Sequence, residues 1–340
     1  MTAAALSSAT QTMSAMSARL PSFALFAALL AAAGLPIYIH APKFYVDEYG
    51  VSLAALGAVL FGLRLMDVIQ DPLLGRLSEK LRHNRAQAVA VAEWIIALSM
   101  AGLFAVTPPM PPLLWFGLML TLLFSAFSFL TIIFYAQGVT TAETLGALGH
   151  LRLARWRETG ALLGVCVAAI APVALGAWMG APFTGFAVGF AVLAGASVLA
   201  MRGEWGVSAA LPSTGFGPIL RDPVARRLLL IALINAAPVA VSSTLFLFFV
   251  ESRLAAPGME GPLLLLFFLS AALAAPFWGM LAERWGAKRA LILGMVLSII
   301  AFGFAITLGA GDWPLFALIC IASGAALGAD MTLLPAIFAN

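Results

Sequence analysis

The sequence predicts an all-α polytopic membrane protein, and two properties of the chain lead to this fold class. Of its 340 residues, 63% are hydrophobic and 10% are charged, whereas soluble domains carry about 25% charged residues. The hydrophobic residues also form continuous runs of about 20 residues or more, which is the length a helix needs to cross a bilayer. Disorder is excluded by the low charge and the 24 Phe. Cys166 and Cys320 both lie inside apolar runs, which excludes a disulfide scaffold and a thiolate metal site.

Ten apolar segments are expected to span the membrane. They must be helical, because hydrocarbon offers the backbone no hydrogen-bond partners. Barrel strands would be about ten residues long and alternating, and these runs are longer and do not alternate. In chain order the segments are residues 22–46, 52–75, 87–107, 112–138, 154–178, 183–201, 227–250, 261–282, 289–310 and 313–338.

The basic residues between these segments predict the orientation of the chain. Fifteen Lys and Arg fall before the first segment or in the loops that share its side, against Lys43 and Arg253 on the other side. Because cytoplasmic loops are enriched in Lys and Arg, the N-terminus is predicted to be cytoplasmic, in what we expect to be a bacterial inner membrane. The basic residues are thereby explained as a topology signal, and no nucleic-acid partner is expected.

The polar stretches predict the domain organisation. Residues 1–20 are rich in Ala, Ser, Thr and Met, without the pattern of a signal peptide, and are expected to form a disordered cytoplasmic tail. Residues 202–226 form the longest polar stretch and are expected to be a cytoplasmic linker. They separate a six-helix bundle over 21–201 from four helices over 227–340.

A sequence repeat relates the two halves. Six residues at the end of the second and the eighth segments and in the loops after them match at one offset of 204 positions. Among them are Pro72 with Pro276, Gly75 with Gly279 and Glu79 with Glu283. A fixed offset between halves of similar topology is typical of a duplicated transporter fold. Glycine is expected to let two helices approach, and the acidic and basic residues to form a charge lock at the cytoplasmic rim. The second copy resembles the cytoplasmic loop motif of the major facilitator superfamily and comprises Gly279, Glu283, Arg284, Gly286, Lys288 and Arg289.

The second segment carries charges inside the membrane. Asp67 and Asp71 are four residues apart, so their carboxylates share one helical face, and Arg64 lies three residues before Asp67. Such groups face the protein interior or a water-filled path, and paired carboxylate oxygens suit a proton or Na⁺. A purely structural Arg–Asp pair is the alternative. Both acids map onto alanines, Ala271 and Ala275, in the second half, as expected for a coupling site that belongs to one half.

The string Arg64-x-x-Asp67-x-x-x-Asp71-Pro72-x-x-Gly75 resembles the second-span signature of the glycoside–pentoside–hexuronide:cation symporters, the melibiose-permease-like branch of the major facilitator superfamily. The resemblance implies that Asp67 and Asp71 bind the coupling cation and that Arg64 lies nearby. It also implies a major facilitator fold. Members of the family have twelve spans, so the ten found here predict a C-terminally truncated version.

The resemblance extends to the predicted substrate cavity. Arg157 matches a family arginine near the cytoplasmic side of the cavity, and Tyr135 falls where the family has an aromatic residue that stacks on the sugar. The acids that grip sugar hydroxyls in the family are replaced by Ala31 and Thr131. This implies a substrate with fewer hydroxyls, or one held by other groups.

Two other polar residues are candidates for the cavity. Tyr38 on the first segment and Asn235 on the seventh could contact the substrate. Alternatively, Tyr38 is an interface residue and Asn235 bonds a neighbouring helix.

The predicted function is cation-coupled symport, with H⁺ or Na⁺, of a small and sugar-like organic solute by alternating access. Besides the solute, the coupling ion and the lipid bilayer, no cofactor or further partner is predicted, and the oligomeric state is left open. A lysolipid symporter of the same fold and a non-transporting, truncated protein or sensor are the alternatives. An enzyme is not expected, because His40, His83 and His150 are scattered and no catalytic motif is present.

Overall fold

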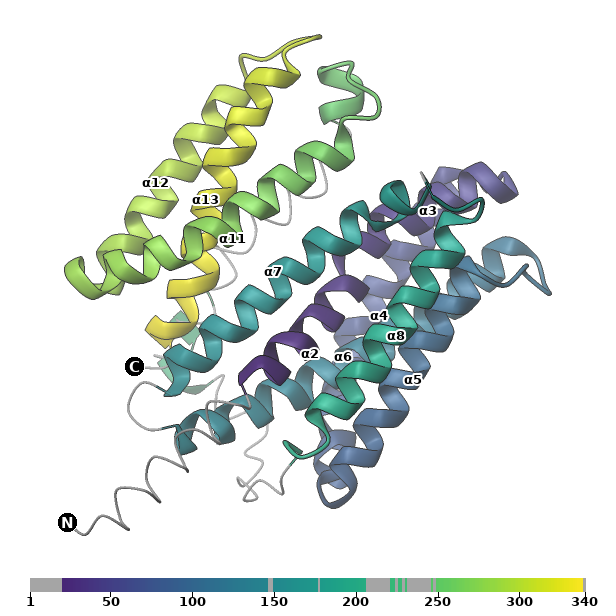
Figure 1. Ribbon diagram of the computed structural model, residues 1–340, viewed down its shortest axis with the longest axis horizontal. Helices are drawn as coiled ribbons and strands as arrows, with labels where there is room; N and C mark the ends of the chain where they lie inside the picture. Colours follow the sequence, from purple (N-terminus) through teal and green to yellow (C-terminus); the bar gives the residue numbers. More distant parts are fainter. Residues whose placement is uncertain are drawn as a thin grey trace.

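The computed structural model describes residues 20–145, 149–176, 178–205 and 249–338, with short pieces at 221–223, 226–227, 230 and 246. The described elements are helices (Figure 1). In chain order they are α2 (Leu20–Ala33), α3 (Leu35–Tyr49), α4 (Leu53–Lys80), η1 (Arg82–Asn84), α5 (Arg85–Phe104), α6 (Pro112–Thr144), α7 (Gly149–Gly176), α8 (Pro182–Met201), η2 (Phe249–Arg253), α11 (Glu260–Trp285), α12 (Ala287–Ala305) and α13 (Trp313–Phe338). Among the described residues, seven helices are long and apolar enough to cross a membrane, or eight if the bent α4 is one span.

The helices follow the predicted spans closely, with one interruption. The first predicted span is divided at Gly34 into α2 and α3. Pro36 stands in the first turn of α3, where its missing N–H leaves the end of α2 without a continuing hydrogen bond. The seventh predicted span, 227–250, lies mostly outside the described residues. The predicted tail lies outside them too, apart from the buried Leu20 that begins α2.

The helices α2 to α8 surround one large apolar core. Its fully buried aromatic residues include Phe23 and Phe26 of α2, which stack on Phe134 of α6. Within this group, α2 and α7 make the most extensive helix contact. A Cβ added to Gly160 or Gly164 would collide with the backbone of Ala24 or Ala28. These glycines therefore let the two backbones touch, as small residues do in membrane helix pairs.

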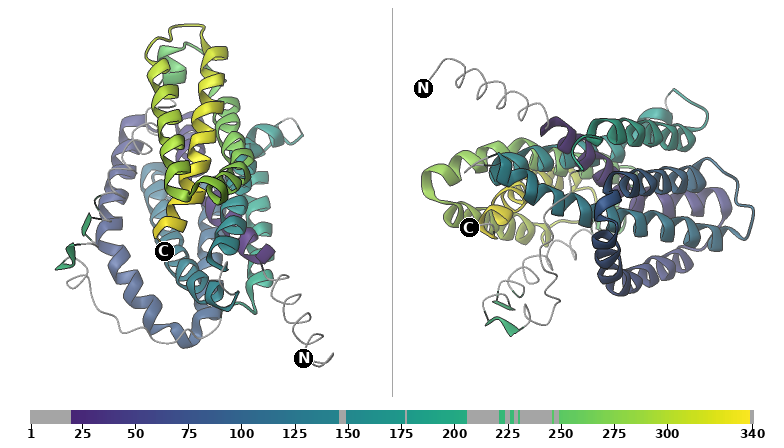
Figure 2. Two further views of the ribbon diagram at one scale, coloured as in Figure 1. Left: turned by 90° about the vertical axis from the view of Figure 1, so that its left-hand side faces the viewer. Right: turned by 90° about the horizontal axis from the view of Figure 1, so that it is seen from below.

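A second group of helices is formed by α11, α12 and α13, which lie beside α7 (Figures 1 and 2). Here Gly324 and Gly328 of α13 face the backbone of Phe267 and Ala271 of α11. A Cβ at Gly328 would lie 2.6 Å from the carbonyl oxygen of Ala271. Contacts of α7 with α11 and α13 join the two groups.

The repeat at an offset of 204 is visible in the helices. Shifted by that number, the ranges of α4, α5 and α6 fall close to those of α11, α12 and α13. Pro72 and Pro276 both lie inside their helices. The role expected for Gly75 and Gly279 was wrong, however, because a Cβ at either position would meet nothing within 4 Å. The motif glycine with a conformational role is Gly286, whose φ of 87° ends α11 and starts α12.

Candidate functional site

The two acids of α4 lie on either side of a bend. The axes of Leu53–Asp67 and Ile69–Lys80 differ by 49°. Pro72 explains the position of this bend, since it has no N–H for the carbonyl of Val68, one turn earlier, and its ring crowds that carbonyl. The carbonyl of Val68, which lies between Asp67 and Asp71 in sequence, therefore loses its helical hydrogen bond. Unwound carbonyls of this kind coordinate cations in other transporters.

A chain of hydrogen bonds connects this bend to α6. The side-chain amide of Gln70 donates to Oδ1 of Asp67 over 2.9 Å. The hydroxyl of Ser125, on α6, donates to Oε1 of Gln70 over 2.9 Å. Neither Gln70 nor Ser125 was predicted from the sequence, because a lone amide and a lone hydroxyl are common in membrane helices. Their position next to the acids makes them part of the candidate site.

Asp71 has an unsatisfied carboxylate oxygen. Its Oδ1 is buried and has no hydrogen-bond partner among the described residues. A buried acceptor without a partner is costly, and a bound cation or proton would satisfy it. The described residues contain no group of three or more His, Cys, Asp or Glu that could hold a metal ion. A cation held here would have to use the two carboxylates with neutral oxygens, as Na⁺ can.

Tyr135, Arg157 and Glu158 form a second polar cluster between α6 and α7. The guanidinium of Arg157 lies 4.3 Å from the centre of the Tyr135 ring. Its Nη2 lies 2.9 Å from Oε1 of Glu158, to which its Nε also donates. The structure thus brings the predicted Tyr135 and Arg157 together, and one face of the ring is covered by the guanidinium. Thr131, one turn before Tyr135, has a buried hydroxyl with no partner among the described residues.

The two clusters lie at different depths of α6. Tyr135 is ten residues after Ser125, which is about 15 Å of helix rise. The acids of α4 are therefore separated from the ring and guanidinium by about half the thickness of a bilayer core.

Several predicted residues are not positioned by the described structure. The side chains of Arg64, Tyr38 and Glu283 lie outside the described residues, although their backbones belong to α4, α3 and α11, and Asn235 lies entirely outside them. In the loop motif, Glu79 pairs with Arg82 over 3.5 Å. Arg284, Lys288 and Arg289 are exposed.

One charged residue inside the membrane was missed by the sequence analysis. Glu93 lies in the middle of α5 and is fully buried. A single Glu in the apolar run 87–107 is the signal that could have revealed it, since an ionisable residue in a span is a functional candidate by default.

Comparison with known proteins identifies the family. Residues 22–340 match the sequence profile of the MFS/sugar transport protein family, where MFS denotes the major facilitator superfamily. The chain belongs to this family. It is an integral multi-pass membrane protein and a transporter rather than an enzyme. No curated protein sequence matches it significantly.

The fold of this MFS transporter is similar to a known structure. A crystal structure of the nucleoside transporter NupG, determined as a point mutant, has a TM-score of 0.62 to it. The similarity covers 95% of this chain and 82% of the NupG chain, at 15% sequence identity. At that identity the likeness concerns the fold, and it agrees with the all-α major facilitator fold predicted from the sequence.

Proposed function

We propose that this MFS transporter is a cation-coupled symporter of a small organic solute, in the manner of the melibiose-permease-like branch. The coupling ion, Na⁺ or H⁺, binds at Asp67 and Asp71 of α4. The solute binds nearer to Tyr135 and Arg157, and the two helix groups rock about it to give alternating access. The N-terminus of the chain lies in the cytoplasm of a bacterial cell, on the side of the basic loops.

The observation that carries this proposal is the buried, unpartnered Oδ1 of Asp71 beside a bend in α4. Asp67 lies on the other side of the bend and accepts from the Gln70 amide, whose oxygen accepts from Ser125 of α6. In the second half the position equivalent to Asp67 is Ala271, which packs against Gly328 of α13. In the second half, α11 and α13 thus pack through small residues, whereas the equivalent helices of the first half, α4 and α6, are joined by polar residues. This contrast favours a dedicated ion site over a structural role for the acids.

The second cluster suggests the class of solute. An exposed aromatic ring beside a guanidinium suits a molecule with a flat apolar face and oxygen acceptors. Sugars and nucleosides have both features. Ala31 and Thr131 replace acids that would bind hydroxyls, so a lysolipid, whose large apolar part needs fewer such bonds, is the second candidate.

Counterflow in proteoliposomes tests the proposal directly. Vesicles with the purified protein are loaded with one unlabelled solute, chosen in turn from sugars, nucleosides and lysophospholipids, and uptake of the labelled solute is followed. We expect exchange of one class, and its accumulation when an inward Na⁺ or H⁺ gradient is imposed. Exchange of no class would favour the non-transporting alternative. Exchange that no ion gradient accelerates would exclude symport.

Ser125→Ala tests the part of the ion site that lies on α6. The change removes the hydroxyl that donates to Gln70. A hydrogen bond of this kind contributes about 1 kcal/mol, so the affinity for the coupling ion should fall by roughly fivefold. Ser128→Ala, on the same helix and also half-buried, is the matched control. Ion affinity is measured by the protection of the protein against thermal unfolding as the ion concentration rises. Equal affinities in both variants would remove Ser125 from the site.

A further inference from the structure

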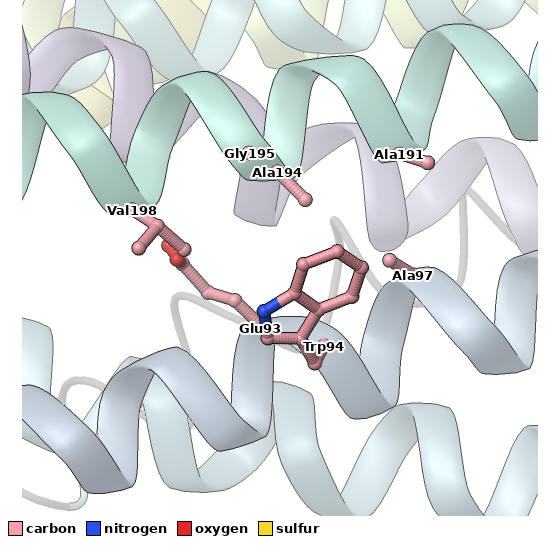
Figure 3. Close-up of a pocket in the computed structure, with 7 residues that line it drawn as sticks. All are labelled: Glu93, Trp94, Ala97, Ala191, Ala194, Gly195 and Val198. Atoms are coloured by element: carbon pink, nitrogen blue, oxygen red, sulfur yellow. The ribbon is translucent and has the colours of Figure 1, made fainter.

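Glu93 lies in a small pocket between α5 and α8, away from the proposed ion and solute sites. The pocket is lined by Glu93, Trp94 and Ala97 of α5 and by four residues of α8, which are Ala191, Ala194, Gly195 and Val198 (Figure 3). Its volume is about 10 Å³, which is roughly the space for one water molecule. Glu93 is eight residues into α5, or about 12 Å of helix rise, and so lies near the middle of the span.

The carboxyl group of Glu93 is not charge-compensated. The hydroxyl of Ser197 donates to its Oε1 over 2.9 Å, and Oε2 is buried without a partner among the described residues. An ionised carboxylate in such a place would be desolvated and bound by a single neutral donor. The uncharged acid needs no counter-ion, and its O–H can be satisfied by the water for which the pocket has space.

In the part of the chain that the structure describes, the helices packed against α5 offer no cation at this level. The helix α8 contains no charged residue, α6 contains only Glu143 near its end, and the other charged residue of α5 is Arg85, about two turns earlier. The helix α3 meets α5 near Phe104, more than two turns beyond Glu93. Its described titratable side chains are therefore remote; they are His40, Lys43, Tyr45, Asp47, Glu48 and Tyr49. The titratable groups of η1, Arg82 and His83, adjoin Arg85.

The outer surface around the pocket is apolar. Val91, Trp94 and Leu98 of α5 and Val192 and Leu199 of α8 are exposed, as expected for a surface in contact with lipid chains. The carboxyl group is therefore separated from hydrocarbon only by the indole of Trp94 and small or branched side chains of α8. A hydrophobic molecule dissolved in the bilayer can reach it, whereas a water-soluble one cannot.

We propose that Glu93 is a second proton-binding site of this transporter, which holds its proton as a neutral carboxylic acid at neutral pH and is accessible from the lipid side. It differs from the Asp67–Asp71 pair because it belongs to the contact between α5 and α8 rather than to the bend in α4. Proton loss would place an uncompensated charge between these two helices, so the state of Glu93 controls how closely they pack. The proposal does not depend on the identity of the transported solute.

Labelling with dicyclohexylcarbodiimide tests this state of Glu93. This apolar reagent reacts with protonated carboxyl groups in membranes. The acid adds across one C=N bond, its proton passing to nitrogen and its oxygen to the central carbon, and an acyl shift then gives a stable N-acylurea without a leaving group. The purified full chain in liposomes is treated at several pH values, and modified peptides are identified by mass spectrometry. We expect an adduct on Glu93 at neutral pH that is lost in strongly alkaline solution, and none on the exposed Asp47 and Glu79.

Two variants make the experiment decisive. Glu93→Gln should lose this adduct, together with the infrared carbonyl band of a protonated acid. Ser197→Ala keeps the acid but removes the donor that favours its ionised form, so its labelling should persist to higher pH than in the wild type. An unlabelled Glu93, labelling that does not change with pH, or an infrared spectrum that Glu93→Gln leaves unchanged would each overturn the proposal.

Discussion

Asp67→Asn is expected to abolish ion-driven uptake while the protein still folds. The substitution keeps the size of the side chain and an oxygen that can accept from Gln70, but it removes one of the two negative charges at the bend of α4. Hydrogen bonds to charged groups contribute about 1.5–3 kcal/mol, so the loss of one charged ligand should weaken ion binding by at least about tenfold. Accumulation against a gradient is measured in proteoliposomes, and folding is measured by size-exclusion chromatography and thermal unfolding.

Asp47→Asn is the matched control for this experiment. Asp47 is exposed and pairs with Lys43 over 3.1 Å on α3, and its replacement should leave uptake unchanged. Counterflow of the solute, which needs no net ion movement, should survive better than accumulation in the Asp67 variant. Normal gradient-driven uptake by Asp67→Asn would refute the assignment of Asp67 to the ion site.

Gly164→Ala is expected to cause a large loss of stability from a single added methyl group. The new Cβ would lie on the backbone of Ala28, and backbone atoms cannot yield as a flexible side chain can. Overpacking of this kind costs about 1–3 kcal/mol, enough to separate α2 from α7 locally. We expect a lower midpoint of thermal unfolding in detergent and a lower yield of folded protein.

Gly189→Ala provides the opposite case with the same chemical change. Gly189 lies within α8, and a Cβ there would meet nothing within 4 Å. Because alanine favours a helix over glycine by about 1 kcal/mol, this variant should be as stable as the wild type or more stable. If both variants lost stability equally, the contact with Ala28 would not be the cause of the loss.

The helices were predictable because the hydrocarbon core of a membrane offers the backbone no hydrogen-bond partners. A continuous apolar run of about 20 residues must become a helix, so the predicted spans agree with α4 to α8 and α11 to α13. Which glycine faces which helix was not predictable in the same way. Gly75 and Gly279 belong to a repeated motif, yet nothing lies against them, whereas Gly160 and Gly164 touch α2. Helix packing depends on the rotation of both partners, and a motif on one helix contains half of that information.

The charged residues of the candidate site could be predicted from the sequence, and its uncharged residues could not. Asp67 and Asp71 stand out because carboxylates are costly in a membrane helix, and their spacing places them on one face. Gln70 and Ser125 carry no charge, and only the geometry of α4 against α6 shows that they extend the site. Glu93 was missed for a different reason, since the strongly apolar residues around it dominate the average hydropathy of its span.

The glycine contact between α2 and α7 determines where this protein can deform. Two backbones in direct contact have no intervening side chains that could change rotamer. We therefore expect α2 and α7 to move together as one rigid unit. The opposite face of α7 meets α11 and α13, which are the described helices that join the two groups. We therefore expect the proposed alternating access to involve sliding at that face, with α2 and α7 moving as one unit. Because Arg157 and Glu158 lie on α7, such a movement should displace them relative to Tyr135 of α6 and so change access to the proposed solute site.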